Sequence, residues 1–156
     1  MDKNLEKTTI QELIDRYVSV SFKVHKKAEA LIKGQIGDDL TNDQHYILRY
    51  ISQSKECTSS ELADAFEVNK SAITAIINRM TERGLIERTR DQSDRRVVYL
   101  TLTEEGHTLY QSCQEKIEQL VQSIITKFEE QEIKNFIETY EKLAFILENK
   151  KEEMEE

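Results

Sequence analysis

Apolar residues return every three or four positions over most of the chain, which is the period of an amphipathic helix. This spacing runs through 13–32, 47–51, 62–66, 73–80, 109–128 and 133–147. Two segments differ, because 85–90 and 97–102 are rich in residues that favour β structure and the second alternates regularly. The pattern therefore predicts a mainly α chain with a small β-hairpin.

Helix starts are marked by a repeated capping pattern. A threonine followed three residues later by Glu or Gln occurs at 9–12, 41–44 and 58–61, where the two side chains can satisfy opposite free amides of a helix N-terminus. Asn69 is placed as the N-cap of a further helix, and Thr103 as the N-cap of the next. Glycines mark the expected stops, namely Gly34, Gly37 and Gly84.

These signals divide the chain into four expected parts. They are an N-terminal helix at 1–37, a central unit at 38–103, C-terminal helices at 104–150 and a frayed tail at 151–156. The joint inside the C-terminal part falls near 129–131, with neither Gly nor Pro to mark it.

The central unit has an order of elements that suits duplex DNA. A short helix, a tight turn at 67–69 and a helix from Lys70 precede the hairpin, which is the layout of a winged helix-turn-helix. With Ile73 and Ile77 turned inward, small and polar side chains occupy the opposite face, so the backbone can approach base edges in the major groove. The expected DNA contacts are Ser59, Lys70, Ser71, Thr74, Ala75, Asn78, Arg79, Arg88, Arg90, Asp94, Arg95 and Arg96.

Within this set the helix residues and the hairpin residues have different expected roles. Bases are expected to face Ser71, Thr74, Ala75 and Asn78. The hairpin tip carries Arg95 and Arg96, of which Arg96 is the stronger candidate, and an arginine there suits the minor groove of A·T-rich DNA.

Both surfaces also have a plainer interpretation. The outward face of the second helix could be ordinary solvated surface, and the tip arginines could pair with Asp91 and Asp94 in a solvated turn. The order of the elements favours DNA binding. Asp94 fits both interpretations, because an acid two residues before Arg96 can hold that guanidinium in position.

Charge is distributed unevenly along the chain. The formal net charge is −8, and residues 104–156 hold six basic and fourteen acidic side chains, which accounts for all of the excess. Residues 70–96 hold seven basic and four acidic side chains. Since phosphate binding responds to local charge, the acidic total is compatible with DNA binding, although it argues against a broad basic surface.

The central segment resembles the MarR family of bacterial transcription regulators. The resemblance rests on SELA at 60–63, SAIT at 71–74, RM-x-x-RGLI-x-R at 79–88, D-x-x-DRR at 91–96 and LTEEG at 102–106. There are small departures: Gln92 stands where many members have proline, and Met80 replaces a common leucine.

The resemblance implies a homodimer built from the N- and C-terminal helices, with one winged unit per protomer on a pseudo-palindromic operator. The apolar stripes at 13–32 and 133–147 favour the same arrangement, because the small central unit cannot cover both; packing within a monomer is the alternative. Two recognition helices must then lie about one helical turn (~34 Å) apart. The expected function is a repressor released by a small ligand.

The resemblance also implies a small phenolic or aromatic effector bound between the dimerisation helices and the DNA-binding unit. Aromatic residues at helical spacing more often form plain core, which is the alternative here. The candidate lining residues are Tyr17, His25, His45, Tyr46, Tyr50, His107 and Tyr110.

Some relatives sense oxidants through a cysteine in the first helix, and others sense metals through His and acidic ligands. This first helix has no cysteine; Cys57, beside a helix start, could have a lowered thiol pKa, and Cys113 lies on an apolar stripe, with inert cysteines as the default expectation. The histidines include no pair at i, i+4 spacing, so no metal site is expected.

Other functional classes find little support. No apolar run is long enough to span a bilayer, no signal peptide is recognised, and the cysteines have neither metal nor disulfide spacing, so we expect a cytoplasmic protein. No nucleophile elbow, phosphate-binding glycine loop or HExxH motif occurs, so no enzyme activity and no cofactor are expected. The contrasting class is a helical protein-interaction module that no longer binds DNA.

Overall fold

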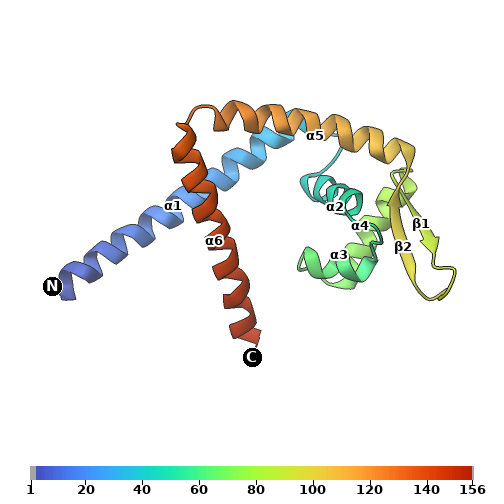
Figure 1. Cartoon of the computed structure of the whole chain (residues 1–156), viewed down its shortest axis with the longest axis horizontal. Helices are drawn as coiled ribbons and strands as arrows, with labels where there is room; N and C mark the ends of the chain where they lie inside the picture. The colour runs from blue at the N-terminus through green and yellow to red at the C-terminus, as the bar shows by residue number, and fades with distance from the viewer. Residues whose placement is uncertain (1–2, 156) are drawn as a thin grey trace. The chain divides into compact units, whose positions relative to one another are not determined.

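The computed structural model describes residues 3–155, with side chains from residue 7 onward. Its elements are α1 (Lys3–Ile36), α2 (Asn42–Gln53), α3 (Ser59–Ala65), α4 (Lys70–Glu82), β1 (Ile86–Arg90), β2 (Val98–Leu102), α5 (Glu104–Ile125) and α6 (Glu130–Glu155) (Figure 1). The helices and the two-stranded antiparallel hairpin confirm the predicted fold class. The chain forms two compact units, an N-terminal unit that ends at Ile117 and a C-terminal unit that begins at Glu118.

Two of the predicted capping patterns start helices. Thr41 Oγ1 accepts a hydrogen bond from Gln44 N at 3.1 Å, while Gln44 Oε1 accepts one from Thr41 N at 3.2 Å, so α2 begins with a complete capping box. Thr58 Oγ1 accepts from Glu61 N at 3.2 Å and caps α3.

The first helix is longer than the sequence predicted. It begins at Lys3, so the expected start at Thr9 is wrong. Neither Gly nor Pro interrupts residues 3–9, and good helix formers there carry the helix past the threonine. The helix ends at Ile36, so the stop predicted at Gly37 is confirmed, and Gly37 takes the left-handed conformation (φ +65°).

The C-terminal helix is also longer than predicted. It continues to Glu155, so residues 151–155 are helical and the expectation of a frayed tail is wrong for them. Lys150 Nζ lies 3.3 Å from Glu153 Oε2, and Lys151 Nζ lies 3.9 Å from Glu155 Oε1. Pairs at this spacing support an exposed helix by a few tenths of a kcal/mol each, roughly.

The core of the N-terminal unit packs around α4. Ile73, Ile77 and Met80 are all 0% exposed, and burial of side chains of this size stabilises a fold by about 1.5–3 kcal/mol each. The other core side chains are Ile36, Leu40, Ile47, Leu48, Ile51, Cys57, Leu62, Ala63, Leu85, Ile86, Leu100, Leu102 and Cys113. Because one stripe of α4 is buried, the opposite face of the helix is turned to solvent.

The hairpin is anchored to the segment that precedes α3. Its two strands place Arg88 opposite Leu100 and Arg90 opposite Val98. Leu100 N donates to Cys57 O at 2.7 Å, which makes an isolated bridge to a third segment. The periodicity did not predict this bridge, because a single paired residue leaves no alternation.

The end of the hairpin joins α5 through a close backbone contact. Thr103 Oγ1 accepts from Gly106 N at 3.0 Å and donates to Gly84 O, while Thr103 N donates to Leu85 O at 3.1 Å. Gly84 has φ +75°, which confirms the expected left-handed stop. A Cβ on Gly106 would lie 2.0 Å from Leu85 O, so the first turn of α5 can approach this carbonyl only with glycine.

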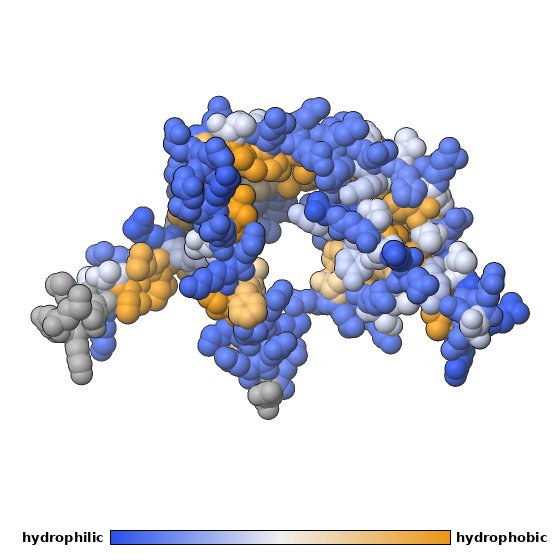
Figure 2. All heavy atoms as spheres, viewed as in Figure 1, coloured by the Kyte–Doolittle hydropathy of each residue, from blue (hydrophilic) through white to orange (hydrophobic). Residues whose placement is uncertain are grey.

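Large apolar side chains remain exposed along α1 and α6, as the orange surface of Figure 2 shows on both helices. On α1 they are Ile10, Leu13, Ile14, Tyr17, Val18, Val20, Phe22, Val24 and Leu31, and on α6 they are Phe136, Ile137, Tyr140, Phe145, Ile146, Leu147 and Met154. Apolar faces of this length mark interaction surfaces rather than scattered exposed residues. Across residues 3–155, no helix combines the length and the hydropathy that crossing a membrane requires.

The contact between Gly106 and Leu85 predicts that Gly106→Ala strongly destabilises the protein. We expect the free energy of unfolding to fall by about 3 kcal/mol, because the new Cβ displaces a backbone carbonyl rather than a flexible side chain. Gly34→Ala is the matched control: nothing lies within 4 Å of its Cβ, and inside a helix alanine is favoured by up to about 1 kcal/mol. Urea unfolding at one fixed protein concentration compares the two, and equal stabilities would contradict the packing described.

Candidate nucleic-acid interface

A tight turn sets α4 against α3. Val68 N donates to Ala63 O at 3.1 Å, and Glu67 takes the left-handed conformation (φ +54°), which reverses the chain within the three residues that were predicted to turn. Asn69 Oδ1 then accepts from Ala72 N at 2.8 Å, which confirms Asn69 as the N-cap of α4. The turn and the cap together fix where α4 begins.

The outward face of α4 gathers the helix residues that were expected to contact DNA. They are small or polar and all exposed, namely Lys70, Ser71, Thr74, Ala75, Asn78 and Arg79. Ser59, expected as a phosphate contact, is half-buried at the first residue of α3. The α4 residues therefore form one continuous surface, whereas Ser59 stands on a separate helix.

One of these residues is joined to the hairpin. Arg88 Nη2 donates to Asn78 Oδ1 at 2.5 Å, so a side chain of β1 and a side chain of α4 are held together on the exposed surface. Both residues were expected to contact DNA, but their mutual hydrogen bond was not predicted.

The tip of the hairpin, drawn in yellow in Figure 1, is folded by Asp91. Its Oδ1 accepts from Ser93 N at 2.7 Å and from Asp94 N at 3.0 Å, and its Oδ2 accepts from Tyr99 OH at 2.9 Å. Hydrogen bonds from Asp94 N, from the Tyr99 hydroxyl and from Ser93 N lower the pKa of Asp91 below its ordinary value. Arg90 Nη1 adds a bond to Arg95 O at 2.9 Å. Sequence reasoning missed the brace made by Tyr99.

Asp94 holds Arg96 at the tip. Arg96 Nε lies 3.0 Å from Asp94 Oδ1 and Nη2 lies 3.1 Å from Oδ2, while Arg96 N donates to the same carboxylate at 3.1 Å. The Arg96 side chain, followed by its backbone N–H, lowers the pKa of Asp94. The predicted positioning of the Arg96 guanidinium by Asp94 is confirmed. The Arg96 side chain is 91% exposed, so the guanidinium lies in solvent. Arg95 is exposed beside it.

Arg83 connects the end of α4 to the segment before α2. Its Nη2 donates to Asp39 O at 2.6 Å, and its Nη1 donates to Gln44 Oε1 at 3.2 Å. Gln44 therefore serves both the α2 capping box and this contact. No sequence signal indicated it, because the partners of Arg83 lie about forty residues away along the chain.

The seven residues expected to line an effector pocket are only partly brought together. His45 is buried, with ring centroids 5.7 Å from Tyr46 and 5.6 Å from Tyr110. Tyr50 packs against Phe66 at 6.3 Å instead. The three remaining candidates are all exposed, namely Tyr17, His25 and His107.

His45 has the environment of a neutral histidine. Burial lowers its pKa from the ordinary value of 6.5; the nearby Gln114 side chain opposes the shift, and the positive charge of Arg49 adds to it. Tyr46 and Tyr110 supply the aromatic neighbours. The cluster thus consists of one buried imidazole packed against two tyrosine rings.

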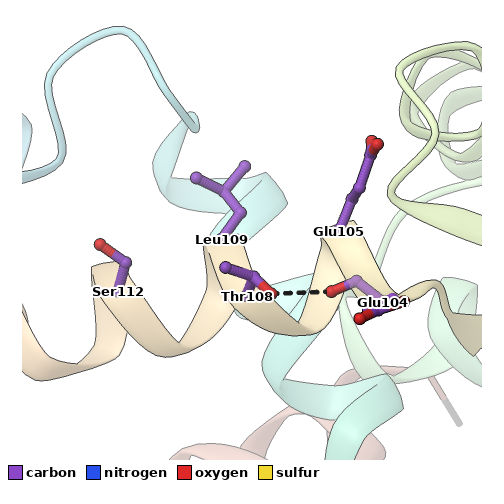
Figure 3. A pocket seen from close by; sticks show the side chains of 5 residues that line it. All are labelled: Glu104, Glu105, Thr108, Leu109 and Ser112. Atoms are coloured by element: carbon purple, nitrogen blue, oxygen red, sulfur yellow. Dashed lines mark hydrogen bonds between the residues drawn. The ribbon is translucent and has the colours of Figure 1, made fainter.

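Two depressions lie on the described surface, and none of the seven candidate residues lines either of them. One of about 290 Å³ lies at the hairpin tip among Arg90, Asp91, Gln92 and Arg95. The other, of about 480 Å³, lies on the first turns of α5. Figure 3 shows its lining side chains, Glu104, Glu105, Thr108, Leu109 and Ser112, with Thr108 Oγ1 hydrogen-bonded to Glu104 O. Two carboxylates at its rim disfavour an anionic ligand there.

Both cysteines have the buried environment of unreactive thiols, which was the default expectation. The idea that Cys57 has a lowered thiol pKa is wrong: burial, followed by the charge of Glu61, raises it to about 11. Burial likewise raises the pKa of Cys113. A thiol that stays protonated is a poor target for oxidants. Among residues 3–155, no three His, Cys, Asp or Glu side chains form a group suited to a metal ion.

Comparison with known proteins gives four informative matches. A model of the MarR family matches residues 38–97. The HTH-type transcriptional regulator YwhA of Bacillus subtilis is 30% identical over 122 residues, which are 78% of this chain and 88% of that protein. The homoprotocatechuate degradative operon repressor of Escherichia coli is 32% identical over 90 residues, 58% of this chain and 61% of that one. Streptococcus pneumoniae FabT in complex with DNA has a TM-score of 0.74 at 25% identity, covering 90% of this chain and 98% of that one.

The burial of His45 predicts a pH-dependent stability. The pKa of His45 is lower in the folded chain than in the unfolded chain, so the unfolded state binds the proton more readily. The contribution of His45 to the free energy of unfolding is therefore fully present above about pH 6.5 and is lost as the pH falls. Relative to His45→Gln, the wild type should lose up to about 1.4 kcal/mol of unfolding free energy per pH unit below that point. Chemical unfolding between pH 7.5 and 5 tests this, with the exposed His25→Gln as control. Parallel pH profiles for wild type and His45→Gln would refute it.

Proposed function

This chain belongs to the MarR family and is a DNA-binding transcriptional regulator, and on that premise we propose that it represses transcription as a homodimer on a pseudo-palindromic operator and is released by a small ligand. Each protomer would insert α4 into a major groove and its hairpin into the neighbouring minor groove. Base contacts would come from Ser71, Thr74, Ala75 and Asn78; Lys70, Arg79, Arg88, Arg90, Arg95 and Arg96 would supply charge, with Ser59 on a phosphate.

The observation that carries the proposal is the surface shared by α4 and the hairpin. The polar face of α4 is free in solvent because its apolar stripe is buried, and Arg96 is held outward by Asp94 beside it. A guanidinium that is already oriented loses less conformational freedom on binding than a free one. This combination matches a groove-binding helix with a minor-groove arginine.

The exposed apolar faces of α1 and α6 support a homodimer. Half or more of Tyr17, Phe22 and Phe136 remains exposed in the single chain, and water contact with aromatic surface of this size is costly. We propose that 1–37 and 104–150 form the dimerisation region and that 38–103 forms the DNA-binding unit. The dimer would set the spacing of the two recognition helices.

The cluster around His45 supports an aromatic effector. The rings of Tyr46 and Tyr110 both pack against the buried His45 imidazole, so a planar apolar ligand beside them would find aromatic surfaces and one polar partner. Tyr17, Tyr50, His25 and His107 complete the set of lining residues that we propose for this ligand. We propose repression rather than activation because the homoprotocatechuate relative from Escherichia coli is a repressor.

Selection from a random duplex library at near-physiological salt tests the proposal. The dimeric fraction should recover an inverted repeat whose half-sites lie about ten base pairs apart. Binding should also weaken steeply as salt rises, because several phosphate contacts release counterions. Recovery of no site, together with salt-independent self-association, would favour the protein-interaction module instead.

Replacement of the wing arginine should separate DNA binding from folding. Arg96→Ala is expected to weaken operator binding by about ten- to a hundredfold, the loss of one groove-inserted arginine, while leaving thermal unfolding unchanged because the side chain is exposed. Lys127→Ala removes the same charge from the C-terminal unit and serves as control. Fluorescence anisotropy on the selected duplex measures both, and equal affinities for the two variants would remove the hairpin from the interface.

A further inference from the structure

The hydrogen bond between α4 and β1 constrains how Asn78 can meet a base. Arg88 comes from the β1 position opposite the buried Leu100, which fixes the origin of its side chain relative to α4. Its Nη2 lies 2.5 Å from Asn78 Oδ1, although the two residues are ten apart in sequence. Both are exposed on the surface that we propose to face DNA.

The chemistry of the pair determines the orientation of the amide. A guanidinium carries only donors, so the group of Asn78 that faces Arg88 must be its carbonyl oxygen. The amide nitrogen, with its two N–H donors, is therefore directed away from Arg88. The positive charge next to Oδ1 also polarises the amide and strengthens those donors.

An asparagine fixed in this way is hindered from reading adenine in the usual manner. The bidentate contact to adenine uses the amide N–H on N7 and the amide oxygen on the N6 amino group. In this chain one lone pair of that oxygen accepts from Arg88, and a second donor that approaches the other lone pair would be repelled by the charge of Arg88. Donation from the amide nitrogen is therefore favoured over further acceptance by the oxygen.

We infer that Arg88 is a specificity-determining positioning residue that biases Asn78 toward donating hydrogen bonds, so that each half-site carries a guanine at the position facing Asn78. Guanine presents two adjacent acceptors, O6 and N7, at its major-groove edge, whereas adenine presents only N7 beside a donor. This inference rests on the proposed function, because it assumes that α4 lies in the major groove.

Three variants test the inference in the random-duplex selection. Asn78→Ala identifies the base-pair position that Asn78 reads, as the position at which selectivity is lost. Arg88→Met removes the guanidinium and keeps the length of the side chain. Arg90→Met is the matched control, because Arg90 lies two residues away on the same strand and loses the same charge.

Affinities are then measured by anisotropy on duplexes that differ only at the position identified. The wild type should prefer guanine over adenine there, and Arg88→Met should shift the guanine-to-adenine ratio toward adenine by about tenfold, since the freed amide can make the bidentate contact. Arg90→Met should weaken binding to both duplexes alike. Because Asn78, Arg88 and Arg90 are all exposed, thermal unfolding of the three variants should match the wild type.

Several results would overturn the inference. A wild-type preference for adenine at that position would do so, as would an Asn78→Ala variant with unchanged selectivity. An Arg88→Met variant that loses affinity uniformly, as Arg90→Met does, would reduce Arg88 to a phosphate contact. In each of these cases an inverted repeat is still recovered and the proposed function stands, whereas failure of the wild type to select any site would remove both.

Discussion

The burial of one stripe of α4 is the constraint on which the rest of the structure depends. Ile73, Ile77 and Met80 are inaccessible to solvent, and together they contribute on the order of 5–9 kcal/mol of the stability of the N-terminal unit. With those side chains inside, the helix cannot rotate about its axis. The exposed face is therefore determined by the core, and residues such as Thr74 and Asn78 are offered to solvent in one fixed arrangement.

The hairpin is positioned by the same core, because Ile86 and Leu100 are buried on its inner face. The contact of Gly106 with Leu85 then links the hairpin to α5, so α4, the hairpin and the start of α5 form one packed body. At the tip, the Asp91 carboxylate accepts hydrogen bonds from the loop backbone, and the Asp94 carboxylate accepts from the Arg96 guanidinium. The wing thus has a defined shape without a proline at Gln92.

Much of this arrangement could be predicted from local chemistry in the sequence. Capping residues such as Thr41 and Asn69 act within three residues of themselves, and the alternation in 97–102 reports one strand directly. Contacts between distant residues left no such signal, which is why the Cys57 bridge to Leu100 and the Arg88 bond to Asn78 were not predicted. The thiol pKa of Cys57 was misjudged because a position beside a helix start favours the thiolate, whereas burial, visible only in the fold, outweighs it.

Chemical footprinting on the selected duplex tests the central claim most directly, namely that the buried stripe of α4 turns its polar face into the major groove with the wing in the minor groove beside it. Guanine N7 methylation should be blocked within two major-groove segments about one helical turn apart, and hydroxyl-radical cleavage should be reduced in the minor groove outside each of them. Protection of the sugar-phosphate backbone without any major-groove protection would contradict the account.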